Sequence, residues 1–261
     1  MSAGSKPVRW GFVGASTWAW RYLVPAVQAV DGAEAVGIFS SSPERGERFA
    51  AAAGLDRSYA SLEELLSDEA VDAVYISTTN DLHAEQAIAA ARAGKHVLCE
   101  KPLALTLADA RAIRDACEEA GVVLATNHHL RAAPTIRAMR ERVEAGEIGE
   151  IVAARVFYAR LLSEEFRGWR LSRPEAGAGV VLDVNVHDAD VVRFLLADEV
   201  AEVTALTANQ GLAEPPIEDS AMGVMRMRGG QLVSFHDAFT VPHAETGIEL
   251  HGTEGSLIGH E

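Results

Sequence analysis

The sequence is poor in cysteine and in basic residues, and it has no long hydrophobic run. Its two cysteines, Cys99 and Cys117, each fall within an expected regular element, so neither a disulfide framework nor a cysteine-based metal site is predicted. The 23 Lys and Arg residues are outnumbered by 38 Asp and Glu residues, and the resulting net charge of -15 argues against a nucleic-acid-binding surface. No apolar run approaches the length of a membrane span, and the opening residues lack the apolar segment of a signal peptide. We therefore expect a soluble, cytoplasmic protein without nucleic-acid or membrane partners.

Hydrophobic residues make up 48% of the chain, enough for a sizeable core and one or two domains. In the first half, short β-rich runs alternate with alanine-rich amphipathic stretches, a pattern typical of βαβ units around a parallel sheet. Strands are predicted at Val8–Val13, Ala35–Phe39, Asp72–Ser77, His96–Cys99 and Val122–Thr126. Helices are predicted from the loop after the first strand to about Val30, over Pro43–Ala53, from Ser61, over Leu82–Ala93 and from Thr106 to Gly121. The expected fold class is α/β, with a doubly wound parallel sheet of the Rossmann type.

The pattern changes after Gly149, where strands follow one another with little helix between them. Helices are predicted over Pro134–Ala145 and Ala178–Leu196, and strands over Ile151–Tyr158, Glu202–Ala208, Ala221–Arg228 and Gln231–Phe239. The last two strands are joined by Gly229-Gly230, a hairpin dipeptide. Consecutive strands favour an antiparallel sheet. We therefore expect two domains, residues 1–127 with the parallel sheet and residues 128–261 with an α+β fold and a mostly antiparallel sheet.

The loop after the first strand has the form of a dinucleotide-binding turn. Gly14-Ala15-Ser16-Thr17-Trp18-Ala19 follows the pattern G-x-G-x-x-G/A, with serine at the second glycine position and alanine at the third. Gly14 permits the tight turn, the small Ser16 lets the backbone approach a pyrophosphate, and Ala19 allows close helix packing. A turn without any ligand would fit the same letters, but the βα alternation that follows favours a nicotinamide cofactor.

The end of the second predicted strand bears on the choice between NAD and NADP. NAD-binding domains place Asp or Glu at this point to accept a hydrogen bond from the ribose 2′-hydroxyl. Here Ser40 and Ser41 stand in its place, with Arg45 at the start of the next helix. Hydroxyls and a guanidinium suit a 2′-phosphate, so NADP is predicted, although Arg45 is also an ordinary solvated helix residue. The segment Ser77-Thr78-Thr79-Asn80 ends a further strand at the same edge, where open α/β sheets bind ligands.

Candidate catalytic side chains occur in two places. Glu100-Lys101-Pro102 follows a buried strand, so the lysine is a candidate to face cofactor and substrate, and Pro102 suits a cis peptide bond; the alternative is a surface lysine before a turn. Asp183 and His187 stand four residues apart on a predicted helix and are expected to share one face. An imidazole there can donate a proton to a carbonyl oxygen, and the alternative is an ion pair on the helix surface.

Two further segments contain side chains that can bind a metal ion. Asn127-His128-His129 and the group His187, Asp188 and Asp190 contain nitrogen and oxygen ligands. Adjacent histidines on a strand point to opposite faces, and no dense ligand spacing emerges, so no metal site is predicted.

Taken together, these features resemble the Gfo/Idh/MocA oxidoreductases. The resemblance is carried by the Gly14 loop, Glu100-Lys101-Pro102 and the Asp183-to-His187 spacing, within the runs RWGFVGAST, SSSPERG, STTNDLH, AGKHVLCEKPLALT, TNHHLR, GWRLSRPEAGAGVVLD, VHDAD, FHDAF and HGTEGSLIG. It implies an NADP-binding Rossmann domain followed by an α+β domain that serves the substrate and dimerisation. It further implies NADPH-dependent reduction of the C2 ketone of a sugar, and a homo-oligomer is possible through the C-terminal sheet.

The resemblance also implies roles for individual residues. His187 would donate the proton, and Lys101 and Asp183 would orient the substrate and tune the basicity of the imidazole. The expected cofactor contacts come from the predicted loops at the sheet edge and from one later loop: Gly14, Ala15, Ser16, Thr17, Trp18, Ala19, Ser40, Ser41, Arg45, Ser77, Thr78, Thr79, Asn80, Asp81, Leu82, His83, Glu100, Lys101, Asn127, Trp169 and Arg170.

Two other interpretations stay open, namely another NAD(P)-dependent sugar or polyol (inositol-like) dehydrogenase of the same family and a non-catalytic NADP-binding sensor, since a fold alone does not fix a substrate. Relatives of the family continue well past the segment HGTEGSLIG, whereas this sequence ends at Glu261. We therefore expect a C-terminally shortened second domain without the late strands and terminal helix. Such a chain is expected to bind NADPH and to turn over poorly.

Overall fold

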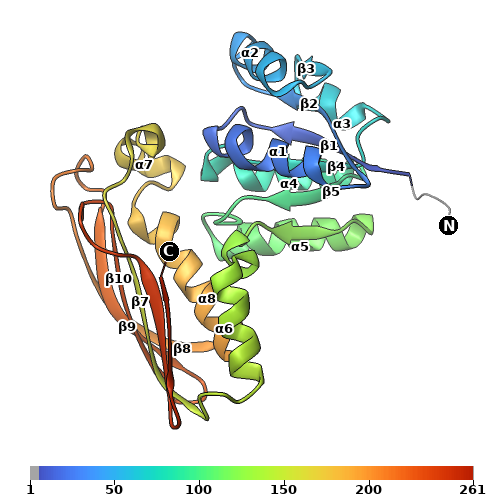
Figure 1. Ribbon diagram of the computed structural model, residues 1–261. Coiled ribbons are helices and arrows are strands. Elements are labelled where there is room, and N and C mark those ends of the chain that lie inside the picture. The colour runs from blue at the N-terminus through green and yellow to red at the C-terminus, as the bar shows by residue number, and fades with distance from the viewer. Residues whose placement is uncertain (1–5, 261) are drawn as a thin grey trace. The chain divides into compact units, whose positions relative to one another are not determined.

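The computed structural model describes residues 6–260 and divides the chain into two compact units, unit 1 over Met1–Asn127 and unit 2 over His128–Glu261. Each unit has its own sheet and its own hydrophobic core (Figure 1). The predicted fold class, a Rossmann-type parallel sheet followed by an α+β unit with a mostly antiparallel sheet, is confirmed.

All strands of the sheet in unit 1 run parallel, in the spatial order β3-β2-β1-β4-β5-β6. They are β1 (Val8–Val13), β2 (Ala33–Phe39), β3 (Arg57–Tyr59), β4 (Ala73–Ile76), β5 (His96–Cys99) and β6 (Leu124–Thr126). The direction of winding reverses between β1 and β4. Open α/β sheets bind ligands outside the carboxyl ends of the strands at such a reversal.

Helices cover both faces of this sheet. They are α1 (Val24–Ala29), α2 (Pro43–Ala53), α3 (Leu62–Ser67), α4 (His83–Arg92) and α5 (Leu107–Ala120), with a π-helical turn η1 (Ala19–Leu23) before α1 and a 3-10 turn η2 (Asn80–Leu82) before α4. Phe12 and Tyr75 point into the core shared with α1 and α2, whereas their neighbours Val13 and Ile76 point into the core shared with α3, α4 and α5. Because successive strand residues face opposite sides, a sheet covered on both faces needs strands that are apolar throughout.

Polar caps and glycines define where these helices begin and end. The side chains of Ser42, Ser61 and Thr106 each accept a hydrogen bond from the backbone N–H three residues later, at the N-termini of α2, α3 and α5. Gly54 and Gly121 end α2 and α5 with left-handed φ angles of 65° and 66°. Glycine adopts this conformation without the steric penalty of a Cβ atom.

Unit 2 is built on a sheet in the order β12-β11-β7-β10-β9-β8. Its strands are β7 (Ile151–Ala159), β8 (Val200–Ala208), β9 (Ser220–Met227), β10 (Leu232–Ala238), β11 (Gly247–Gly252) and β12 (Ser256–His260). Its helices are α6 (Pro134–Glu144), α7 (Trp169–Ser172) and α8 (Val186–Leu196), with short turns η3 (His129–Ala132), η4 (Glu164–Phe166), η5 (Pro174–Ala176) and η6 (Val181–Asn185). α6 and α8 lie side by side on one face of the sheet (Figure 1).

The two faces of this sheet differ in burial. Val156, Phe235 and Leu250 are at most 6% exposed in the core that α6 and α8 cover. On alternate positions, Met222 and Leu232 are 55% and 45% exposed. Since no helix of the described chain is assigned to that second face, unit 2 is a two-layer structure with an apolar open side.

The structure also departs from the sequence-based expectations in several elements. β3, β11 and β12 were not predicted, because β3 is only three residues long and the last two strands are interrupted by glycines and polar residues. β7 and β10 pair in parallel, so the sheet is mixed. Trp169, expected in a loop, begins the helical turn α7. The helix predicted over Ala178–Leu196 begins at Val181 as a π-helical turn and becomes α-helical at Val186.

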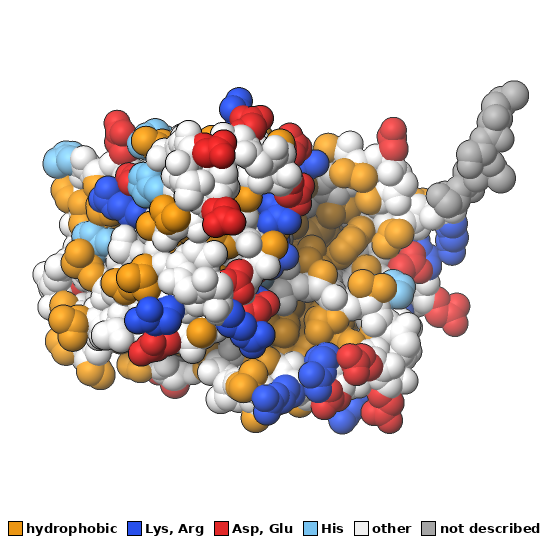
Figure 2. Space-filling model, turned by 90° about the horizontal axis from the view of Figure 1, so that it is seen from below, with side chains coloured by type: hydrophobic (Ala, Val, Ile, Leu, Met, Phe, Trp, Pro, Cys, Tyr) orange, Lys and Arg blue, Asp and Glu red, His pale blue; other side chains and the backbone are white. Residues whose placement is uncertain are grey.

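Charged side chains are mixed on the surface. On the face shown in Figure 2, Lys and Arg side chains lie scattered among Asp and Glu side chains. Several form exposed ion pairs, such as Arg155 with Glu249 and Arg226 with Glu202, both at 3.1 Å. Pairs of this kind contribute at most about 1 kcal/mol each, so the hydrophobic cores dominate stability. Within residues 6–260, no helix combines the length and the apolar character that crossing a bilayer requires.

Candidate active site

The turn after β1 is shaped by a close approach to the end of β4. Gly14 has φ +101°, and a Cβ atom there would lie 2.9 Å from Cγ2 of Thr78 and 3.0 Å from the backbone carbon of Ser77. Both the backbone angle and the contact demand glycine. The first glycine of the predicted dinucleotide-binding turn is therefore required by the fold of unit 1 itself.

Serine hydroxyls tie the same turn to β4. Ser16 Oγ donates to Ser77 Oγ at 2.9 Å and accepts from the Ala19 N–H at 2.9 Å, and Ser77 Oγ donates to the Gly14 carbonyl at 3.2 Å. Ala19 is fully buried at the start of η1, as expected for the third small position of the pattern. Serine at the second glycine position thus holds the turn in shape before any ligand binds.

The end of β2 presents hydroxyls and a guanidinium at the N-terminus of α2. Ser40 is 4% exposed, and its Oγ accepts hydrogen bonds from Arg45 Nε and from the Ser42 N–H, both at 3.3 Å. Arg45 and Ser41 are exposed. A helix N-terminus, a guanidinium and hydroxyl groups are all donors to an anion, and this strand end carries no carboxylate of its own before Glu44.

The ends of β4, β5 and β6 meet at Glu100. Its Oε1 accepts from the Tyr75 hydroxyl at 2.5 Å and from Asn127 Nδ2 at 2.6 Å, and its Oε2 accepts from the Lys101 N–H at 3.3 Å. The peptide bond between Lys101 and Pro102 is cis, as the sequence suggested. The structure therefore brings three of the predicted cofactor residues, Glu100, Lys101 and Asn127, into one hydrogen-bond network.

The remaining predicted residues of unit 1 surround the loop after β4. Thr78 Oγ1 donates to Gln86 Oε1 at 2.7 Å, Asn80 is 5% exposed at the start of η2, and Asp81 and Leu82 are exposed. His83 is fully buried, and its Nδ1 lies 2.9 Å from the Pro102 carbonyl oxygen. Burial lowers the pKa of the His83 imidazole, so the ring is neutral at pH 7. We therefore assign His83 to support of the loop that carries Lys101, in place of the direct cofactor contact predicted from sequence.

In unit 2, His187 lies in the first turn of α8 among other imidazoles. It is 8% exposed, and its ring meets those of His128 and His129 edge to face, with centroid distances of 5.9 and 5.0 Å. Asp190, 5% exposed, accepts from Arg131 Nε at 2.7 Å and Nη2 at 2.5 Å, and its Oδ2 lies 3.7 Å from His128 Nδ1. Because His187 is buried, an ion pair on an exposed helix surface does not describe it.

Asp183 lies in η6 beside two other predicted residues. Its Oδ1 accepts a hydrogen bond from Arg170 Nε at 3.3 Å. The central guanidinium carbon of Arg170 lies 4.7 Å from the centroid of the Trp169 ring. Asp183 lies in the π-helical turn η6 and His187 in the first turn of α8, so the segment is not the single α-helix that the sequence predicted, and the shared face of the two residues stays a prediction. Lys101 belongs to unit 1, whereas Asp183 and His187 belong to unit 2.

Sequence reasoning missed several polar residues of the interior. Asp188 and Asp237 are 2% and 0% exposed, and Asn185 Nδ2 donates to Asp237 Oδ2. Burial raises the pKa of Asp237 to about 7 and raises that of Asp188, which also lies next to Asp237. The sequence did contain a signal for Asp237: it is an acidic residue within a strand whose other inward-facing positions are apolar. Among the described residues, no group of three or more His, Cys, Asp or Glu side chains is arranged to hold a metal ion.

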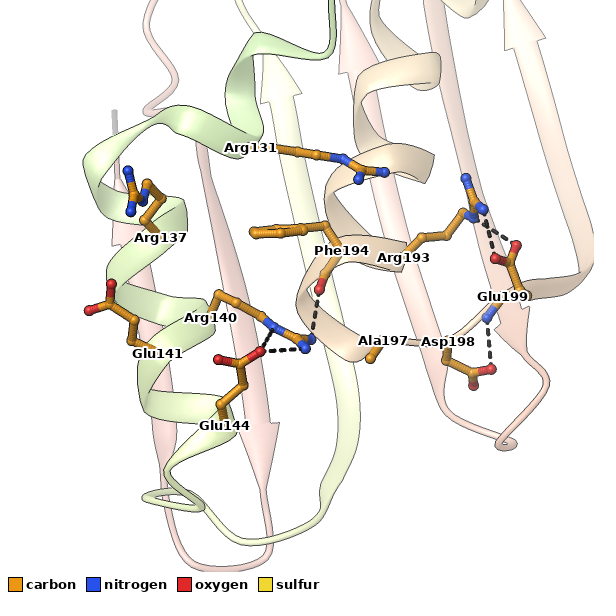
Figure 3. A pocket seen from close by; sticks show the side chains of 10 residues that line it. All are labelled: Arg131, Arg137, Arg140, Glu141, Glu144, Arg193, Phe194, Ala197, Asp198 and Glu199. Atoms are coloured by element: carbon orange, nitrogen blue, oxygen red, sulfur yellow. Dashed lines mark hydrogen bonds and ion pairs between the residues drawn. The ribbon is translucent and has the colours of Figure 1, made fainter. Parts of the chain in front are cut away.

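Unit 2 has a groove lined by residues of α6, of α8 and of the segment that follows α8 (Figure 3). Arg140 pairs with Glu144 at 2.6 Å and donates to the Phe194 carbonyl at 2.8 Å, and Arg193 donates to Glu199 at 2.7 Å. The Arg140 guanidinium thus satisfies carbonyls at the C-terminal end of α8, a structural role. None of the predicted site residues lines this groove: its lining is Arg131, Arg137, Arg140, Glu141, Glu144, Arg193, Phe194, Ala197, Asp198 and Glu199.

Comparison with known proteins matches both units. Residues 8–128 match the oxidoreductase family with an NAD-binding Rossmann fold, and residues 136–258 match the GFO/IDH/MocA C-terminal domain. The 1,5-anhydro-D-fructose reductase of Ensifer adhaerens is 55% identical over 251 residues, which cover 96% of this chain and 75% of the reductase.

More distant relatives share the same architecture. A D-xylose 1-dehydrogenase (NADP(+)) 2 of Haloferax volcanii is 32% identical over 95% of this chain and 74% of its own length. The crystal structure of GenD2 from gentamicin A biosynthesis, in complex with NAD, has a TM-score of 0.91 at 25% identity and covers 98% of this chain and 73% of GenD2. With both units matched and a relative identical at more than half of the aligned positions, the chain belongs to the Gfo/Idh/MocA family of oxidoreductases.

Proposed function

We propose that this chain catalyses the NADPH-dependent reduction of 1,5-anhydro-D-fructose to 1,5-anhydro-D-mannitol at the C2 ketone. The observation that carries the choice of substrate is the 55% identity to the Ensifer adhaerens reductase across 96% of the chain. In this proposal, residues 1–127 are the cofactor-binding domain and residues 128–261 the substrate domain. Family membership supports an oxidoreductase that acts on a sugar, and the proposal adds the particular sugar and the particular nucleotide.

The donor groups of unit 1 fit a dinucleotide. The Gly14 turn, held to β4 by Ser16 and Ser77, presents backbone at the carboxyl edge without side chains that would block a pyrophosphate. Ser40 and Arg45, at the N-terminus of α2, suit the 2′-phosphate of NADPH better than a bare ribose hydroxyl. One relative is a D-xylose 1-dehydrogenase of NADP(+), and GenD2 was solved in complex with NAD, so the choice of NADPH is supported by Ser40 and Arg45.

The chemistry divides between hydride and proton. Bound NADPH supplies the hydride. His187 would hold the proton that the ketone oxygen receives, and its contact with two other imidazoles keeps the ring in a fixed orientation. Asp183 would orient the substrate through its carboxylate, which Arg170 holds in place. Lys101 would stabilise negative charge on the carbonyl oxygen, with Glu100 holding its backbone.

The test follows nicotinamide absorbance in purified protein supplied with 1,5-anhydro-D-fructose and, in parallel, NADPH or NADH, with other ketoses and polyols as a panel. Loss of NADPH with this substrate alone would support the proposal. Preferential oxidation of another sugar would favour a different sugar dehydrogenase of the family, for which the D-xylose dehydrogenase relative is the supporting observation. NADPH binding without any turnover across the panel would favour a non-catalytic sensor.

The open side of the unit 2 sheet supports a further proposal, that the chain self-associates through this sheet. Leu206 on β8 is 82% exposed, Ile258 on β12 is 59% exposed and Met222 on β9 is 55% exposed. Apolar side chains gathered on one sheet face lose contact with water when a second copy covers them. Light scattering is expected to give more than the monomer mass for the natural chain and a smaller mass for Leu206→Glu.

A further inference from the structure

Tyr75 places a hydroxyl inside the core of unit 1. The residue lies within β4, is fully buried, and packs its ring edge to face on Phe12 with a centroid distance of 6.1 Å and an interplanar angle of 72°. The hydroxyl donates a hydrogen bond to Oε1 of Glu100 at 2.5 Å. A valine or isoleucine would fill a buried parallel strand without a polar group that needs a partner.

The acceptor of this hydrogen bond is the carboxylate that joins three strand ends. Oε1 of Glu100 also accepts from Asn127 Nδ2, after β6, and Oε2 accepts from the Lys101 N–H. The Asn127 N–H in turn donates to the Cys99 carbonyl at 2.7 Å. The Glu100 carboxylate therefore accepts hydrogen bonds from the Tyr75 hydroxyl, the Asn127 amide and the Lys101 N–H. One orientation of the carboxylate satisfies all three donors.

The Tyr75 hydroxyl is a permanent donor. Burial, followed by the nearby Glu100 carboxylate, raises its pKa well above the usual value for tyrosine. The phenol therefore stays protonated at neutral pH and keeps its hydrogen directed at Oε1.

We propose that Tyr75 is a positioning residue for the cofactor-binding edge: its hydroxyl fixes the Glu100 carboxylate, and through it the Asn127 amide and the Lys101 backbone. The inference rests on the proposed function, because Glu100, Lys101 and Asn127 are the residues expected to meet the nicotinamide end of the cofactor. Tyr75 itself, fully buried, acts through Glu100.

A purely structural role would also make Tyr75 sensitive to mutation, so a matched control is needed. Tyr59 provides one in the same unit: it is 5% exposed and donates its hydroxyl to Asp68 Oδ2 at 2.7 Å. Tyr59→Phe and Tyr75→Phe each remove one buried hydroxyl that donates to a carboxylate and leave the ring in place. Asp68 follows α3 and belongs to none of the loops assigned to the cofactor.

The experiment measures NADPH affinity by fluorescence titration, and thermal midpoints, for the natural chain, Tyr75→Phe, Glu100→Gln, the double variant and Tyr59→Phe. Loss of one hydrogen bond to a charged group should weaken NADPH binding by about tenfold in Tyr75→Phe. Tyr59→Phe should lower the thermal midpoint with affinity unchanged. In the Glu100→Gln background, Tyr75→Phe should add little further loss, because the carboxylate through which Tyr75 acts is already gone.

Two results would overturn the inference. Affinity in Tyr75→Phe within about twofold of the natural chain, or equal to that of Tyr59→Phe at matched loss of thermal stability, would reduce Tyr75 to core packing. Independent, multiplied losses in the double variant would show that Tyr75 does not act through Glu100. A natural chain that bound neither NADPH nor NADH would remove the proposed function together with this inference, which distinguishes that failure from the other two.

Discussion

The candidate site residues of unit 1 and those of unit 2 are held by different kinds of contact. In unit 1, hydroxyl and amide donors dominate: Ser16 on Ser77, and Tyr75 and Asn127 on Glu100. In unit 2, guanidinium and carboxylate groups pair, as in Arg131 with Asp190 and Arg170 with Asp183. Neutral donors keep a loop in shape over a wide pH range, whereas imidazoles set among charges respond to protons. The difference suits the binding of an elongated anionic cofactor in unit 1 and the handling of a proton in unit 2.

The interiors of the two units differ in the same direction. The core of unit 1 is apolar on both faces of its sheet, and the polar side chains within it, such as Tyr75 and His83, are neutral. Unit 2 buries a neighbouring pair of carboxyl groups, Asp188 on α8 and Asp237 on β10. Two neighbouring carboxyls removed from water share a proton, because ionising both would leave two uncompensated charges. A change of pH near neutrality should therefore alter the stability of unit 2 more than that of unit 1.

The largest expected effect separates proton handling from cofactor binding. His187→Ala should reduce turnover by about a hundredfold to ten-thousandfold, because a general acid contributes that much to a proton-coupled step. NADPH affinity should stay within about threefold of the natural chain, since the proposed cofactor contacts do not include the imidazole. Steady-state kinetics and fluorescence titration measure the two quantities separately.

His251→Ala is the control, because that histidine is half-buried on β11, with its Nδ1 2.9 Å from Ser256 Oγ, and lies outside the site. Turnover of His187→Ala equal to that of the control would remove His187 from the mechanism. Equal losses of turnover and NADPH affinity in His187→Ala would instead mean that cofactor binding and proton transfer are not divided between unit 1 and unit 2.

The next effect concerns the stability of unit 2 against pH. The folded pKa of Asp237, about 7, lies above that of an unfolded aspartate, so the folded state holds its proton to a higher pH. Stability from this group is full below about pH 4 and is lost as pH rises through about 7. At about 1.4 kcal/mol per pKa unit, the loss amounts to a few kcal/mol. Asp237→Asn, which cannot ionise, should show a shallower fall of the thermal midpoint between pH 5 and 8.

Asp72 in unit 1 supplies a control of opposite sign. Hydrogen bonds and charge from Arg9 hold the pKa of that carboxyl well below its usual value, so its stabilisation is present above about pH 4 and is lost as pH falls. Asp72→Asn should lower the thermal midpoint by a constant amount between pH 5 and 8. If Asp237→Asn kept the full slope of the natural chain over this window, the buried carboxyl pair would not be its source.

The sequence predicted unit 1 better than unit 2 for a physical reason. In unit 1, local signals coincide with tertiary structure: caps at Ser42, Ser61 and Thr106, a glycine at Gly14 that the turn demands, and apolar strands covered on both faces. The strand ends of a doubly wound sheet also share one edge, so the sequence alone predicts that residues such as Ser40 and Glu100 lie at the same edge. The residues after the second strand supplied the expectation of NADP, and family resemblance supplied the expected substrate.

What the sequence did not reveal depends on contacts between distant segments. The parallel pairing of β10 with β7 arises from the order of strands in space, which no local pattern encodes. The pairing of Arg131 with Asp190 spans 59 residues, and Tyr75 appeared to be an ordinary core residue until its hydroxyl was seen to reach Glu100, 25 residues away. The π-helical turn η6 that contains Asp183 was likewise not predicted, because the sequence pattern indicated one continuous α-helix.

The smallest expected effect tests whether the donors of unit 1 choose the nucleotide. Arg45→Ala should weaken NADPH binding by about tenfold, because the guanidinium beside Ser40 would lose its charge-assisted contact with the 2′-phosphate. NADH affinity should not change, since NADH lacks that phosphate. Arg48→Ala is the matched control, one turn further along the exposed side of α2 with the same loss of charge. Equal weakening of NADPH and NADH binding, or equal effects of the two substitutions, would mean that general electrostatic attraction, and not the end of β2, recognises the cofactor.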